Sequence, residues 1–160
     1  MAIRTIREEG DDILKKVSRP VEVVDDKIRE LAQDMLDTMH KFNGVGLAAV
    51  QVGILKRVLV IHLDYEKDEP IILINPEIIK EKGTQTCEEG CLSFPNKFAK
   101  IERPEELTVV GLDENGKKVE IKGKGLLAQA LSHEIDHLNG EVFIDKIVPG
   151  TLEYVKPEEK

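Results

Sequence analysis

Apolar residues recur at intervals of three and four between residues 25 and 43, which predicts an amphipathic α-helix there. An aspartate at position 25 or 26 can cap the first turn, and Gly44 suits a left-handed exit after the last one. The residues before Val24 are expected to be mostly extended. The positions that form the predicted apolar stripe are Ile28, Leu31, Ala32, Met35, Leu36, Met39 and Phe42.

Short runs typical of β-strands follow this helix. Residues 57–63, 71–74 and 107–112 are rich in β-branched and other apolar side chains, and residues 118–122 alternate as a return strand. The Asp-Glu-Asn-Gly sequence at 113–116 is typical of a hairpin turn. Because short strands cluster between two helical segments, we expect an α+β fold, with small antiparallel or mixed sheets packed around a central C-terminal helix.

That C-terminal helix is predicted over residues 124–139, with Gly140 ending it. At 100° per residue its leucines and Ile135 form a core stripe, and Ser132 and Asp136 lie in a polar sector. His133 and His137 fall together on a third side, next to Leu126 and Ala130, with Glu134 between them and the core stripe.

This arrangement is the H-E-x-x-H pattern. Two neutral imidazoles one turn apart can bind one metal ion, and a glutamate beside them can take a proton from water on the metal. The alternative is a pair of ordinary surface or core histidines. The adjacent glutamate and the independently predicted helix favour the metal site.

Composition restricts the classes of partner. The chain has 160 residues, 41% of them hydrophobic, and a formal charge of −8, which disfavours DNA, RNA and anionic membranes as electrostatic partners. We expect one domain over residues 1–150 and a charged, frayed tail over 151–160. The acidic start lacks a signal-peptide pattern, no apolar stretch approaches the roughly 20 residues of a membrane span, and only two cysteines occur. A cytoplasmic location is therefore expected.

A catalytic metal needs a third protein ligand and an open position. Phe143 occupies the place of the third histidine that often follows this motif, and His40 and His62 read as structural residues. Cysteine remains, with Cys91 in the unusual Glu-Glu-Gly-Cys-Leu-Ser-Phe-Pro stretch favoured over Cys87. Cys87 is better explained as a small buried residue, and a disulfide between the two is disfavoured in a reducing compartment.

The glycine-rich segment 44–53 is not a dinucleotide fingerprint, since it lacks the G-x-G-x-x-G spacing. Its glycines permit close approach of a ligand to the backbone. Gln51 is the one neutral amide in this apolar run. Its side chain can stabilise a developing oxyanion or, as the alternative, tie down a loop.

Three segments, GVGLAAVQ, EEGCLSFP and HEIDHLNG, resemble in order and spacing the signature motifs of peptide deformylases. The resemblance covers nearly the whole chain. It implies an enzyme that removes the N-formyl group from the formyl-methionine of newly made polypeptides and releases formate. An H-E-x-x-H endopeptidase and a non-enzymatic, metal-stabilised peptide-binding module remain as alternatives.

The resemblance also implies roles for individual residues. Glu134 would act as general base and then as acid, while the Gln51 amide and the Leu92 N–H would stabilise the oxyanion. One divalent metal is implied, Fe(II) in preference to Zn, Ni or Co, with water as its fourth ligand. A monomer is expected, with possible transient contact with the ribosome. The implied metal ligands are Cys91, His133 and His137.

A substrate site follows in the same way, with the methionine side chain in an apolar pocket beside the C-terminal helix. Cys87 is expected to help shape this pocket. Ser132 replaces the glutamine that family members usually carry before the first histidine, and we expect only a small effect from it. The residues implied to contact substrate are Val45, Gly46, Glu89, Gly90, Leu126, Gln129 and Ala130.

Overall fold

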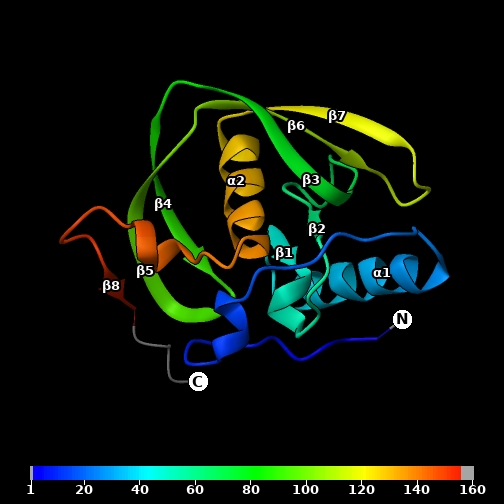
Figure 1. Cartoon of the computed structure of the whole chain (residues 1–160). Helices are drawn as coiled ribbons and strands as arrows, with labels where there is room; N and C mark the ends of the chain where they lie inside the picture. Colours follow the sequence, from blue (N-terminus) through cyan, green and yellow to red (C-terminus); the bar gives the residue numbers. More distant parts are fainter. Residues whose placement is uncertain (1, 156–160) are drawn as a thin grey trace.

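The computed structural model describes residues 2–155, which form two antiparallel sheets around a central helix (Figure 1). The larger sheet has five strands in the order β1-β2-β3-β6-β7. Its strands are β1 (Gly46–Ala48), β2 (Val58–Ile61), β3 (Ile71–Lys82), β6 (Glu106–Leu112) and β7 (Lys118–Lys124). The smaller sheet contains β4 (Gln85–Cys91), β5 (Phe94–Arg103) and β8 (Glu153–Tyr154). The predicted α+β class is confirmed.

Helix α1 (Asp26–Lys41) matches the predicted first helix. The Asp25 side chain accepts a hydrogen bond from the N–H of Ile28 at 3.1 Å, so it caps the first turn as expected. Six of the seven residues of the predicted apolar stripe are buried against β1 and β2, together with Val58, Val60 and Ile74. Phe42 is the exception, since it follows the last helical residue and is exposed. The left-handed residue after the helix is Asn43, with a φ of 56°, and not Gly44 as expected.

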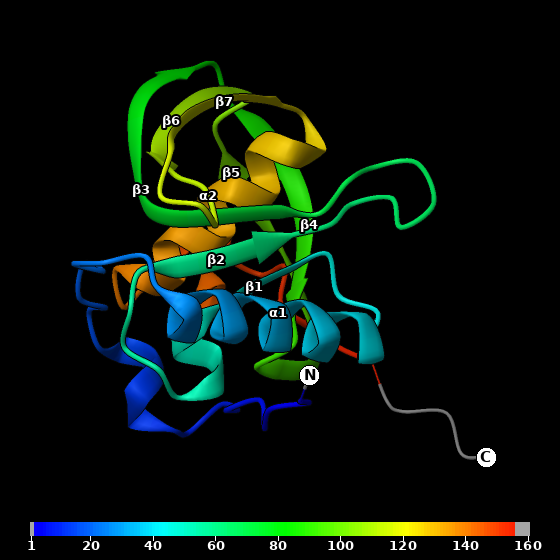
Figure 2. The same ribbon diagram turned by 90° about the vertical axis from the view of Figure 1, so that its right-hand side faces the viewer.

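The strands β1 and β2 are covered on both faces, which explains why every residue of Val58–Ile61 is buried. Alternate side chains of a strand point to opposite faces. Val58 and Val60 therefore pack in the cluster with α1, while Leu59 and Ile61 pack in the cluster with the second helix. Figure 2 shows α1 running alongside β1 and β2, with α2 behind these strands.

Helix α2 (Leu126–Leu138) lies between the two sheets, with β4 and β5 on one side and β3, β6 and β7 on the other (Figure 1). Ten of its thirteen residues are buried, including Ser132, Glu134 and Asp136. At its C-terminal end the Leu138 carbonyl accepts hydrogen bonds from the Ser18 N–H at 2.8 Å and from Arg57 Nη1 at 3.0 Å. The helix with the histidine motif is thus held at its end as well as along its sides.

Several elements differ from expectation or were not anticipated. The N-terminal segment includes a 3₁₀ helix, η1 (Asp12–Lys15), because Asp11 caps it. The run 71–74 continues as a strand past Pro76, where a register shift between Ile74 and Glu77 accommodates the proline. Strands β4 and β5 were not predicted, and two further 3₁₀ turns occur, η2 (Ala49–Val52) and η3 (Phe143–Lys146).

The predicted tail is not frayed at its start. Glu153 and Tyr154 form β8, which pairs with Phe98 and Lys97 of β5, and Thr151 donates a hydrogen bond to the Val148 carbonyl. The rest of the predicted tail, residues 156–160, lies outside the described residues. Across residues 2–155, no helix combines the length and apolar character that crossing a membrane requires.

Candidate metal centre

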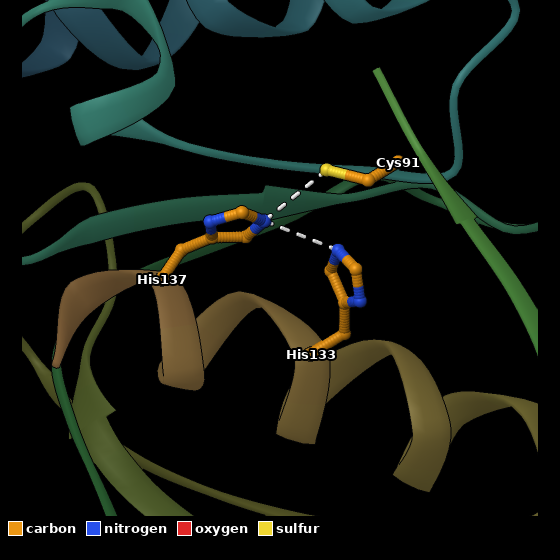
Figure 3. A group of neighbouring side chains, drawn as sticks. All are labelled: Cys91, His133 and His137. Atoms are coloured by element: carbon orange, nitrogen blue, oxygen red, sulfur yellow. Dashed lines mark hydrogen bonds between the residues drawn. The ribbon is translucent and has the colours of Figure 1, made fainter. Parts of the chain in front are cut away.

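Cys91, His133 and His137 converge on one point inside the molecule (Figure 3). The Nε2 atom of His137 lies 3.3 Å from Cys91 Sγ and 3.2 Å from His133 Nε2. All three donor atoms lie within 4.8 Å of one another. The three side chains come from two elements, α2 and the end of β4, and Cys91 precedes His137 by 46 residues in the chain.

These separations fit a tetrahedral metal ion. Bonds of about 2.0–2.1 Å to nitrogen and 2.3 Å to sulfur would place two nitrogens about 3.3 Å apart, and a nitrogen and a sulfur about 3.6 Å apart. The observed 3.2 and 3.3 Å are close to both values. Burial lowers the pKa of His137 well below its usual value, which favours the neutral imidazole that binds metal. The set leaves a fourth tetrahedral position for a non-protein ligand.

Local structure explains how each ligand reaches the centre. His133 and His137 are separated by one helical turn, so both side chains leave α2 on the same side. Cys91 is the last residue of β4, where the register with β5 shifts between Gly90 and Cys91. This bulge lies beside the candidate site, a position at which bulges commonly re-aim a side chain.

A buried ionic network surrounds the far side of His133. Its Nδ1 hydrogen-bonds to Glu89, the arrangement that fixes the tautomer of a metal-binding histidine. Arg103 donates from Nε and Nη2 to the two oxygens of Glu89 at 3.1 and 2.6 Å. Its Nη1 donates to Asp136 and, at 3.2 Å, to the hydroxyl of Ser132.

The opposite charges in this network keep Glu89 and Arg103 ionised although both are buried. Burial raises the pKa of Glu89, but hydrogen bonds from His133 and Arg103 outweigh burial and lower it to about 2. Burial likewise acts to lower the pKa of Arg103, and its bonds to Glu89 and Asp136 raise it above the usual value. Glu89 is therefore a carboxylate that holds His133, and Ser132 is part of the same network.

Glu134 lies on the metal side of α2. Its Oε2 is 4.0 Å from His133 Nε2, and its Oε1 is buried without a hydrogen-bond partner among residues 2–155. Burial raises the pKa of Glu134 to about 7. Gly46 of β1 approaches it so closely that a Cβ atom there would lie 2.5 Å from Oε2. A carboxyl group with such a pKa can accept and return a proton near neutral pH.

Gln51 reaches the centre from η2. Its Oε1 accepts the N–H of Ala48 at 2.9 Å, and its Nε2 lies 3.0 Å from Ser93 Oγ and 3.5 Å from Cys91 Sγ. Both readings of Gln51 are thus compatible with its position, since it fixes a turn and also faces the cysteine ligand.

A cavity of about 1010 Å³ opens beside these groups. Gln51, Cys91, Leu92, His133 and Glu134 line it, whereas His137 does not. It is also lined by residues 3–6 of the N-terminal segment, which were not expected there. All seven residues that the sequence implied as substrate contacts line it: Val45, Gly46, Glu89, Gly90, Leu126, Gln129 and Ala130.

The remaining candidates lie elsewhere. Cys87 packs in an apolar cluster with Phe94 and Ile101 and is not among the cavity-lining residues, so the expectation that it shapes the pocket is not met. Both cysteines are free. His40 Nε2 lies 2.9 Å from His62 Nδ1, which makes the two histidines partners of each other rather than of the centre.

Arg103 and Ser93 are the functional-site neighbours that sequence reasoning missed. For Arg103 a signal was available, because buried Ala99 and Ile101 alternate with exposed Lys100 and Glu102 and place position 103 on the buried face. A buried arginine requires carboxylate partners. For Ser93 the sequence offers no comparable signal, since its bond to Gln51 joins residues 42 positions apart.

Comparison with known proteins decides the family. A family model described as "Polypeptide deformylase" matches residues 3–152. The chain belongs to this family. A peptide deformylase from Alkaliphilus metalliredigens is 55% identical over 92% of this chain and 99% of its own.

Solved peptide deformylases share the fold. The crystal structure from Legionella pneumophila has a TM-score of 0.89 and 47% identity, and covers 92% of this chain and 88% of its own. A Met-Ala-Ser-bound class I type b structure from Acinetobacter baumannii has a TM-score of 0.86 and 35% identity, and covers 91% of this chain and 99% of its own. The family that the three motifs indicated is thus confirmed, its named members are enzymes, and Cys91, His133 and His137 form a candidate metal site in this chain.

Proposed function

We propose that the protein hydrolyses the formyl amide at the N-terminal formyl-methionine of newly made polypeptides, yielding formate and a free amino terminus. The observation that carries this proposal is the buried Glu134 carboxylate with an unpartnered oxygen, next to the Cys-His-His donor set in an open cavity. A purely structural metal site has no use for a base beside its ligands.

Cys91, His133 and His137 would hold one divalent metal, which we propose to be Fe(II), with Zn, Ni and Co as possible substitutes. When bound, the metal would act as a Lewis acid and lower the pKa of water. Glu89 holds His133 in the orientation that binding requires, and Arg103 keeps Glu89 ionised.

Glu134 acts as the general base and acid. Its unpartnered Oε1 accepts the proton that the attacking water loses, and the same carboxyl group then donates that proton to the departing amine nitrogen. The reaction adds one water molecule across the amide bond, so that the C–N bond is replaced by a carboxyl group on formate and a free amine on the peptide. The pKa of about 7 supports both steps at neutral pH.

Gln51 and Leu92 stabilise the charge that develops on the formyl oxygen. The Nε2 of Gln51 and the backbone N–H of Leu92 are the proposed donors, and both residues line the cavity. Gln51 is nearly completely buried and hydrogen-bonded on two sides, so it needs little reorganisation during the reaction.

The substrate lies in the cavity with its methionine side chain beside α2. Leu126 and Ala130 offer apolar surface, and Gly46 and Gly90 allow the substrate backbone to approach. Val45, Glu89 and Gln129 complete the proposed contacts. The related Acinetobacter baumannii structure with bound Met-Ala-Ser supports a peptide that begins with methionine as the ligand.

The cellular setting is proposed on the same basis. We propose that the enzyme acts in the cytoplasm as a monomer, with residues 1–150 as its catalytic domain and nascent chains as its substrates. Residues 151–154 continue this domain, since Glu153 and Tyr154 pair with β5. The charge of −8 makes RNA a poor anchor, so any contact with the ribosome would be transient.

The test is formate release from a formyl-Met peptide by anaerobically prepared, Fe(II)-loaded protein. Glu134→Ala should abolish turnover while the metal content stays at that of the wild type, because residue 134 is not a ligand. Cys91→Ser should lower the metal content itself. Cleavage of internal peptide bonds without any need for a formyl group, or no formate at all, would contradict the proposal.

A further inference from the structure

The side-chain amide of Gln51 is fixed by two hydrogen bonds of opposite kind. Its oxygen accepts from the Ala48 N–H at 2.9 Å, and its nitrogen donates to the Ser93 hydroxyl at 3.0 Å. Rotating the amide by half a turn would place a donor against the Ala48 N–H. The two bonds together therefore define one orientation of the amide plane.

That orientation directs the second N–H of the amide toward the metal centre. An amide nitrogen has two hydrogens, and Ser93 accepts one of them. The second is donated to Cys91 Sγ in a long hydrogen bond of 3.5 Å, so it lies on the side of the candidate metal ligands. The terminal torsion of a glutamine has a broad, soft preference, so without Ser93 only the Ala48 bond and this long bond to sulfur would restrain the amide plane.

Ser93 is itself held rigidly. Its residue is fully buried in the turn between β4 and β5, and its carbonyl accepts the Glu9 N–H at 2.7 Å. The Arg7 N–H donates to the Gln51 carbonyl, also at 2.7 Å. In an extended segment, the N–H groups of residues i and i+2 point the same way. The N–H groups of Arg7 and Glu9 therefore bind the carbonyls of Gln51 and Ser93 from one segment, the N-terminal arm.

We propose that Ser93 is a positioning residue for the deformylation reaction: its hydroxyl orients the Gln51 amide so that the second N–H, which points toward Cys91, meets the developing oxyanion. This inference rests on the proposed oxyanion role of Gln51. Ser93 does not touch substrate. It acts through Gln51, and its contribution disappears when that amide is absent.

The size of the effect is bounded. Removing one oxyanion donor costs about 100- to 1000-fold in kcat, which sets the expected loss for Gln51→Ala. Ser93→Ala keeps the donor and loosens its orientation, so we expect about a 10-fold loss of kcat, with KM changed by less than about 2-fold.

The experiment is a double-mutant cycle on the metal-loaded enzyme with Ser93→Ala, Gln51→Ala and the combination of both. Ser18→Ala is the matched control, because Ser18 is also buried but its hydroxyl has no partner within residues 2–155. Kinetics, metal content and Tm are measured for every variant. In the Gln51→Ala background, Ser93→Ala should lower kcat by no more than about 2-fold.

The outcomes separate the two proposals. Unchanged kcat in Gln51→Ala overturns the oxyanion role of Gln51, and with it the role of Ser93. A large loss in Gln51→Ala with no loss in Ser93→Ala overturns the Ser93 proposal alone. An equal loss from Ser93→Ala in both backgrounds, or a similar loss in Ser18→Ala, also overturns it, since Ser93 would then be only structural.

A spectroscopic measurement is independent of turnover. In Zn-loaded protein, NMR of the Gln51 side-chain amide should show slow hydrogen exchange, because the group is buried and hydrogen-bonded. Ser93→Ala should increase this exchange rate about 10-fold or more, while Ser18→Ala leaves it unchanged. Equal exchange rates in the wild type and Ser93→Ala would overturn the proposal.

Discussion

Replacing Arg103 with methionine tests the ionic network behind His133, the proposed metal ligand. Methionine retains much of the length of the side chain but removes its charge and its hydrogen bonds to Glu89, Asp136 and Ser132. Asp136 keeps Lys146, whose Nζ lies 3.1 Å away. Glu89 loses the one arginine that bonds to it among residues 2–155, so the unpaired carboxylate of Glu89 accounts for most of the loss of stability.

The magnitude follows from two independent arguments. Breaking a buried ion pair by removing one partner costs about 3–5 kcal/mol. Burial raises the pKa of Glu89, and the bonds from His133 and Arg103 together bring it from 4.5 down to about 2. This difference corresponds to about 3 kcal/mol, of which Arg103 supplies a part and His133 the rest. We therefore expect Arg103→Met to lower the free energy of unfolding by about 3 kcal/mol, or Tm by roughly 6–12 °C.

The assay is thermal unfolding of the metal-stripped protein between pH 7 and pH 3, so that metal release does not contribute. Because the folded state depresses the pKa of Glu89, its stabilisation is present above about pH 4.5 and is lost as pH falls toward about 2. The difference between wild type and variant should accordingly narrow as the pH falls.

Arg29→Met is the matched control, since Arg29 pairs with the almost fully exposed Asp26 and should matter by less than about 1 kcal/mol. Adding Glu89→Gln to Arg103→Met should restore part of the loss. An Arg103→Met protein as stable as Arg29→Met, or a difference that does not depend on pH, would refute the reasoning.

Three further substitutions probe other contacts. Gly46→Ala places a Cβ atom 2.5 Å from Glu134 Oε2, so kcat for formate release should fall at least about 10-fold while metal content stays constant. Burial raises the pKa of Glu134 to about 7, so the protonated carboxyl stabilises the metal-free fold below pH 4.5, and this stabilisation is lost as the pH rises through 7. Glutamine resembles the protonated form at every pH. The Tm of Glu134→Gln should therefore match that of the wild type near pH 4.5 and exceed it at pH 8. Arg57→Met removes the charged donor to the Leu138 carbonyl and should cost about 1.5–3 kcal/mol in urea unfolding, with little change in KM.

The sequence predicted the helices well and the second sheet poorly. Residues 26–41 and 126–138 carry strong helical periodicity and clear end signals, and both helices formed where expected. Strands β4 and β5 contain many charged residues, and their pairing depends on partners up to 18 positions apart. The alternation at residues 99–103 is a local sign of a strand, but no local pattern records the pairing of β4 with β5, and residues 85–103 were left without strands.

The candidate site divides in the same way. His133, Glu134 and His137 follow from helical spacing, whereas elimination reduced the third ligand to the two cysteines and the family resemblance implied Cys91. The residues that hold these groups in place were not predicted from the sequence. Arg103, Ser93 and the N-terminal arm make their contacts with segments that are distant in the chain. A motif identifies the groups that react, whereas the groups that hold them depend on the folded chain.

The bulge at the end of β4 has a consequence for how the chain tolerates changes in length. Gly90 pairs with Phe98 and Cys91 with Phe94, so one step on β4 corresponds to four on β5 and residues 95–97 have no opposite partner in β4. An insertion or deletion of one residue at 95–97 only enlarges or shrinks the existing bulge. An insertion or deletion of one residue between Cys87 and Cys91 instead reverses the face of the strand to which the Cys91 side chain points. Length variants should therefore retain metal in the first region and lose it in the second.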